Sequence, residues 1–87
     1  MSNNNSAKKR ERQNITRRMR NRAVKSEVRT AIKNFDKCVL AEDKAAAEVA
    51  MKESFKLLDS ATSKGILHRN TSSRKKSRIY AALAKLN

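Results

Sequence analysis

Arginine and lysine are the residues of this sequence whose number and spacing could do chemistry, and that chemistry is the binding of phosphate groups. The 87 residues include 22 Lys and Arg against 8 Asp and Glu, which gives a net charge of +14. The charge is +9 over residues 1–37, −2 over residues 38–63 and +7 over residues 64–87. Because each basic end repels itself, the composition predicts a polyanionic partner.

The N-terminal bases form a cluster in which Glu11 is the only acid before Glu27. A solvated helix face would carry more acids for balance, so we interpret this cluster as a nucleic-acid-binding surface. Part of it forms a ridge at helical steps of four, three and four that can follow a phosphate backbone: Arg18, Arg22, Lys25 and Arg29. The predicted contact residues of the whole cluster are Lys8, Lys9, Arg10, Arg12, Arg17, Arg18, Arg20, Arg22, Lys25 and Arg29.

A second basic cluster lies near the C-terminus, where no acid follows Asp59. Such a run can be the solubilising face of a terminal helix, but the lack of any compensating acid favours contact with a polyanion. Two clusters on different elements indicate contact with more than one nucleic-acid segment. The predicted contact residues here are His68, Arg69, Asn70, Arg74, Lys75, Lys76 and Arg78.

Other kinds of site find little support in the sequence. His68 is the only histidine and has no Cys or carboxylate cluster around it, so we expect no metal and no cofactor. The single Cys38 excludes an internal disulfide, and one glycine cannot form a phosphate-binding loop. No carboxylate pair is placed for acid–base work, so we expect neither an enzyme nor a small-molecule substrate. Residues 8–22 offer only Ile15 and Met19 as large apolar residues, too few for a membrane-surface helix.

The elements that must position these bases are helices, because the chain has no proline, one glycine and no sustained two-residue alternation. From Val24 onward an apolar stripe runs at steps of three and four, which puts it on one face of a helix. Its members are Val24, Val28, Ala31, Ile32, Phe35, Cys38 and Val39. Toward the N-terminus the same line is occupied by Arg20, Arg17, Gln13 and Arg10. One helix over about 7–40 would therefore face a protein core with its second half and an anionic partner with its first.

Two further helices complete the predicted fold. One begins after the N-cap Asp43, ends at Gly65 and carries the apolar residues Ala47, Ala50, Met51, Phe55, Leu57, Leu58 and Ala61. The other runs over about 71–86 after the N-cap Asn70, with Ile79, Ala82, Leu83 and Leu86 on its inner face. The predicted class is an all-α antiparallel three-helix bundle with a long, overhanging basic first helix. We divide residues 1–87, a single domain, into a disordered tail (1–6), a basic arm (7–22) that orders on its partner, and the bundle (23–87).

The kind of nucleic acid is harder to predict from composition. Phe35, Phe55 and Tyr80 are the only aromatic residues and both phenylalanines fit the core, so no aromatic platform for stacking bases is available. Readout is therefore mainly of shape and phosphates. A zipper-type DNA binder needs three or four heptads and this stripe supplies about two. A basic, architectural DNA-binding protein remains the alternative. An Arg-rich start also occurs in organellar transit peptides, but here it merges with the first predicted helix.

Several tracts together carry a resemblance that covers nearly the whole chain. They are Ser6-Ala7-Lys8-Lys9-Arg10, Val28-Arg29-Thr30-Ala31-Ile32-Lys33, Asp43-Lys44-Ala45-Ala46-Ala47, Lys64-Gly65-Ile66-Leu67-His68-Arg69-Asn70 and Arg74-Lys75-Lys76-Ser77-Arg78. In this order and at these spacings the chain resembles the S-twenty family of bacterial small-subunit ribosomal proteins. It departs from the family pattern at Glu42, where relatives often have Gly or a small residue, and at Ser73, where they often have Ala.

The resemblance implies a three-helix bundle in the cytoplasmic ribosome that binds 16S ribosomal RNA directly and bridges RNA helices during assembly. Family members bind the 5′ domain and also lie against the long penultimate helix of that RNA. The family has no enzymatic activity and no required metal. Carried to this chain, its RNA-facing tracts are Ser6 to Arg10, the arginines up to Arg29, and His68 to Arg78.

Overall fold

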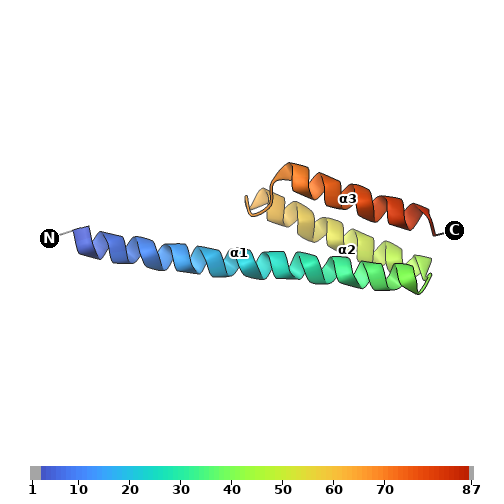
Figure 1. The fold of residues 1–87 in the computed structure, drawn as a ribbon, viewed down its shortest axis with the longest axis horizontal. Coiled ribbons are helices and arrows are strands. Elements are labelled where there is room, and N and C mark those ends of the chain that lie inside the picture. Colours follow the sequence, from blue (N-terminus) through green and yellow to red (C-terminus); the bar gives the residue numbers. More distant parts are fainter. Residues whose placement is uncertain (1–2, 87) are drawn as a thin grey trace.

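Three helices, joined by two short connections, make up the part of the chain that the computed structural model describes, residues 3–86. They are α1 (Asn3–Leu40), α2 (Lys44–Ser63) and α3 (Arg69–Ala84). In Figure 1, α2 runs back along the second half of α1, and α3 returns in the direction of α1. The predicted all-α three-helix bundle with a long first helix is confirmed.

The first half of α1 extends well beyond the other two helices (Figure 1). The molecule measures 67 × 21 × 14 Å and has a radius of gyration of 17.6 Å, against about 12 Å for a compact chain of this length. Every side chain from Ser6 to Arg20 is exposed, and Val24 is the first stripe residue to pack on the core. The extension from Asn3 to Arg20 is about 27 Å long.

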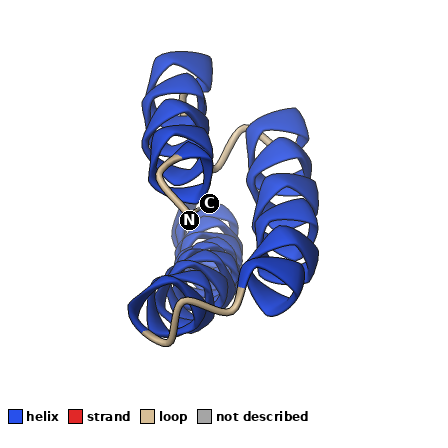
Figure 2. Ribbon diagram, turned by 90° about the vertical axis from the view of Figure 1, so that its right-hand side faces the viewer, coloured by secondary structure: helices blue, strands red, loops and turns tan. Residues whose placement is uncertain are grey.

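The core is small and is built from all three helices. Phe35 of α1 and Ala47, Leu58 and Ala61 of α2 are fully buried, and α3 adds Ile79 and Leu83. All seven members of the predicted stripe of α1 are buried or half-buried, as are all the predicted inner residues of the second and third helices. Leu86 is half-buried just beyond α3, which ends at Ala84 rather than at about residue 86. Figure 2, seen along the long axis, shows the three helices side by side at the bundle end. Among the described residues, no helix is long and apolar enough to cross a membrane.

Both connections begin with the same backbone motif. Lys64 caps α2, Gly65 has φ 74°, and the N–H groups of Gly65 and Ile66 donate to the carbonyls of Thr62 (3.0 Å) and Ala61 (2.9 Å). This is a Schellman motif with the left-handed residue that the sequence predicted to be Gly65.

After α1 the same motif occurs with Glu42 in the left-handed position, at φ 56°. The N–H groups of Glu42 and Asp43 donate to the carbonyls of Val39 and Cys38, both at 3.0 Å. A glutamate has a Cβ that disfavours this conformation, so Glu42 occupies the most demanding position of the turn. Asp43 then caps α2 as predicted, because its carboxylate accepts from the Ala46 N–H at 3.1 Å.

Two predicted helix starts are wrong. The first helix begins at Asn3 rather than Ala7, so Ser6 lies inside it and residues 3–6 of the predicted tail are helical; residues 1–2 lie outside the described part. Once a helix is nucleated, each added residue gains a backbone hydrogen bond, and the three asparagines do not prevent this. The third helix begins at Arg69 with His68 as N-cap, two residues before the predicted cap Asn70. The half-buried Leu67 fixes the chain there by packing on the core.

Candidate nucleic-acid interface

The basic arm presents its charges to solvent without neutralising them internally. All its Lys and Arg side chains are exposed. In the described part of the chain the one ion pair joins Lys76 to Asp59, far from the arm in sequence. The one side-chain hydrogen bond found within the arm runs from the Thr16 hydroxyl to the Arg12 carbonyl (2.9 Å) and involves no guanidinium. The arm therefore offers charged donors in all directions around a single helix.

The predicted ridge continues from the arm onto the bundle. Arg18, Arg22, Lys25 and Arg29 line one shallow hollow of about 520 Å³ on the surface of α1, together with Asn21 and Ser26. The helical steps that define the ridge also extend it by four residues to Lys33, which the sequence analysis did not include. The ridge ends there, because the next residue in this line is Asp36.

The two predicted clusters meet in one hollow between α1 and α3, and Lys33 adds a further base to it. Lys25, Arg29 and Lys33 of α1 line the same hollow as Lys75 of α3, and its volume is about 340 Å³. We call this hollow the α1–α3 crevice. Its remaining lining is apolar and consists of Val28, Ile32 and Leu67. A smaller hollow of about 210 Å³ adjoins it, shares Ile32 and Lys75, and adds Arg78.

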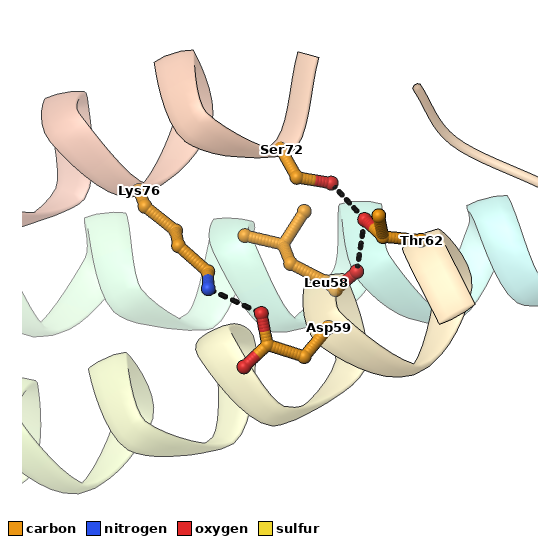
Figure 3. Close-up of polar contacts among 5 residues, drawn as sticks. All are labelled: Leu58, Asp59, Thr62, Ser72 and Lys76. Carbon is orange, nitrogen blue, oxygen red and sulfur yellow. Dashed lines mark hydrogen bonds and ion pairs between the residues drawn. The ribbon is translucent and has the colours of Figure 1, made fainter. Parts of the chain in front are cut away.

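The second cluster is divided between two sides of α3. Lys75 and Arg78 face α1 across the hollows described above, whereas Lys76 faces α2. Figure 3 shows the ammonium group of Lys76 directed at the Asp59 carboxylate. The same ammonium lies 5.5 Å from the centre of the Phe55 ring. Lys76 thus binds its own chain, while Arg69 and Arg74 are exposed.

A short chain of hydroxyls joins α2 and α3 beside this ion pair (Figure 3). The Thr62 hydroxyl donates to the Leu58 carbonyl at 2.8 Å, so its one proton is used and Ser72 must donate to Thr62. Ser72 is buried and holds the first turn of α3 in place. The neighbouring Ser73 is exposed within a continuous helix, so the start of α3 is regular at this residue.

His68 and Asn70 have local roles at the start of α3. The Nδ1 atom of His68 accepts a hydrogen bond from the Asn70 backbone N–H at 3.1 Å, which makes His68 the N-cap. An accepting Nδ1 leaves Nε2 as the N–H donor of the neutral ring, on an exposed side chain. Among the described residues, no three His, Cys, Asp or Glu side chains come together to hold a metal ion.

Comparison with known proteins gives a consistent result over nearly the full length. The model of the family described as "Ribosomal protein S20" matches residues 2–84. The chain is 48% identical to small ribosomal subunit protein bS20 of Nitrosomonas eutropha and 49% identical to that of Nitrosomonas europaea, over 95% of both chains in each case. It is 44% identical to the bS20 protein of Mycobacterium tuberculosis over 99% of this chain and 100% of that protein.

Proposed function

Because the chain belongs to the ribosomal protein S20 family and is thereby a structural constituent of the small ribosomal subunit, we propose that it binds 16S ribosomal RNA directly. Its lysines and arginines neutralise phosphates where RNA helices approach one another closely. The protein thereby bridges RNA segments that would otherwise repel. The resemblance that the sequence carries points to the 5′ domain and the long penultimate helix as those segments.

The observation that supports this mechanism best is the near absence of internal neutralisation. The net charge is +14, and in the part of the chain that the structure describes only Lys76 pairs with an acid. An isolated bundle gains nothing from this arrangement, because like charges on the arm and ridge repel and oppose compaction. Contact with phosphates converts that repulsion into favourable energy through the release of counterions.

The geometry supports bridging rather than contact with a single RNA segment. The arm projects about 27 Å from the bundle as a single helix about 10–12 Å wide. The crevice lies on the surface of the bundle, between α1 and α3. RNA bound to the arm can contact it from several sides, whereas RNA bound at the crevice contacts the protein from one side only. The ridge from Arg18 to Lys33 joins the two surfaces, so both can be occupied at once.

Salt dependence of binding tests this electrostatic mechanism. If about eight phosphates are neutralised, the logarithm of the affinity for the 16S 5′ domain falls with the logarithm of salt concentration at a slope of about −6 to −7. Equilibrium titration between 50 and 300 mM KCl measures that slope. A slope shallower than about −2 would overturn the mechanism. Duplex DNA added as competitor at about 0.15 M salt distinguishes RNA recognition from general polyanion binding, which would let DNA displace the RNA at equal phosphate concentration.

A further inference from the structure

Two hollows of similar size flank the buried half of α1, and their charges are opposite. The α1–α3 crevice has a volume of about 340 Å³ and is lined by four bases and no acid. The hollow between α1 and α2 has a volume of about 360 Å³ and contains Glu27, Glu53 and the half-buried Leu57. The crevice is thus the one of the pair that suits an anionic occupant, and the α1–α2 hollow provides an internal control.

The apolar part of the crevice is not explained by phosphate binding. Phosphate groups are strongly hydrated and gain nothing from aliphatic neighbours, yet Ile32 and Leu67 are only half-buried and line the hollow together with Val28. An occupant that covers these side chains must have an apolar surface close to a negative charge. A nucleotide has both, since its base has two apolar faces and its phosphates are charged.

The size and donors of the crevice fit one such unit. Its volume is at the lower end of the range for pockets that hold a small molecule, and it is far too narrow for an RNA helix. Arg29 lines it, and a guanidinium plane can stack on a base where no aromatic ring is present. The adjoining hollow continues along α3 past Lys75 to Arg78 and also contains Asp36, so its two bases outnumber its one acid beside the inserted nucleotide.

We propose that the α1–α3 crevice receives one unstacked nucleotide of the bound RNA, with its base against Ile32 and Leu67 and its flanking phosphates on Lys25, Lys33 and Lys75. This inference rests on the proposed binding of 16S RNA and adds base contact to it. The protein would then contact a bulge, loop or junction of the RNA as well as the phosphate backbone of RNA helices. Such positions are the ones at which RNA bases are free to leave the stack.

Methyl NMR of the wild-type protein bound to the 16S 5′ domain tests the inference without any variant. The chain has four isoleucines and six leucines, so their labelled methyl groups are readily assigned. Insertion of a base shields the methyls of Ile32 and Leu67, shifts them upfield and gives cross-peaks to base protons. The methyls of Leu57 stay unchanged. Unshifted Ile32 and Leu67 methyls in a saturated complex would overturn the inference and leave the proposed function intact.

A matched pair of substitutions gives an independent readout. Leu67→Asn and Leu57→Asn each remove a half-buried leucine that packs against the core. Because Leu67 also precedes the cap of α3, circular dichroism and urea unfolding are measured on both variants, and binding is compared only where both are folded. We expect Leu67→Asn to weaken RNA binding about five- to tenfold with an unchanged salt slope, because an apolar contact is lost and no phosphate contact is. Leu57→Asn should bind like wild type. Equal losses in both variants would refute base insertion, and a wild-type protein with no affinity for the RNA would refute the proposed function itself.

Discussion

The two halves of α1 are one uninterrupted helix with opposite surroundings. From Val24 to Val39 the helix buries a stripe on α2 and α3, and Phe35 is completely covered. From Ser6 to Arg20 every side chain is exposed and most of the long ones are basic. The bundled half is held by tertiary packing, whereas the arm has only its backbone hydrogen bonds and intrinsic propensity, opposed by like charges. A single helix therefore packs against the core along one half and exposes basic side chains, which we propose to bind RNA, along the other.

The largest expected difference between the halves is in the stability of their backbone hydrogen bonds. We predict that amides of residues 8–22 exchange with almost no protection in the free protein. Amides of residues 28–39 should be protected up to the global free energy of unfolding, about 5 kcal/mol for a small domain. Hydrogen–deuterium exchange with NMR detection measures both sets in one experiment. Equal protection in the two halves would show that the arm is stable without RNA, and the proposed ordering on binding would be wrong.

Truncation of a large apolar side chain should separate the halves nearly as clearly. Phe35→Ala removes the largest fully buried side chain and leaves a cavity, so we expect a loss of about 3–5 kcal/mol in unfolding free energy. Met19→Ala, at a side chain that is 67% exposed on the arm, should change it by less than about 0.5 kcal/mol. Urea unfolding followed by circular dichroism measures both. A clear loss in Met19→Ala would mean that the arm folds back on its own bundle.

Removal of charge from the arm should weaken RNA binding without lowering the unfolding free energy. The fourfold variant Arg10→Gln, Arg17→Gln, Arg20→Gln, Arg22→Gln keeps helix propensity and length. We expect RNA affinity at 0.15 M salt to fall about a hundredfold and the salt slope to become shallower by about 3, since about four phosphate contacts are lost. The unfolding free energy should be unchanged or slightly higher, because repulsion is relieved. A variant that binds with the wild-type slope would exclude the arm from the interface.

Substitutions in the two connections should change the stability of the bundled half alone, and by smaller amounts. Gly65→Ala adds a Cβ to a residue with left-handed backbone, and that Cβ meets no other atom within 4 Å. We therefore expect backbone strain alone to lower the unfolding free energy, by about 1–2 kcal/mol. Glu42→Gly relieves that strain at φ 56° and removes a negative charge at the C-terminal end of α1, so we expect a gain of about 0.5–1 kcal/mol. Thermal unfolding of both variants provides the measurement. A loss of stability in Glu42→Gly would show that its side chain supports the turn.

Much of the helical fold could be predicted from the sequence, because local residue patterns determine it. The apolar stripe of α1, the cap Asp43 and the left-handed Gly65 each depend on residues within a few positions of one another. The division of the second cluster was not predictable in this way. Whether Lys75 or Lys76 contacts its own chain depends on which neighbours α3 meets, because Asp59 and Phe55 come from another helix.

Local patterns also failed where tertiary packing selects the residue. Ser54 and Ser72 are buried, although neither residue contributed to the apolar periodicity of the sequence. His68 replaces Asn70 as the cap of α3 because Leu67 packs on the core just before it. Lys33 is the opposite case, since its step of four from Arg29 was visible in the sequence, and its role follows from Lys75 on the other side of the crevice.

Substitution of the adjacent lysines Lys75 and Lys76 should have the smallest effects, and the two variants should separate binding from stability within α3. Lys75→Gln should leave folding unchanged and make the salt slope shallower by about 0.7–0.9, since one crevice cation is lost. Lys76→Gln should leave the slope unchanged and cost about 0.5–1 kcal/mol of stability, because it loses a partly exposed ion pair with Asp59 and the contact with the Phe55 ring. Salt titration and urea unfolding of both variants distinguish the roles. If Lys76→Gln also made the salt slope shallower, the Lys76 ammonium would have to leave Asp59 for a phosphate when RNA binds. In that case α3 would contact RNA with the side that packs on α2 as well as with the side that faces α1.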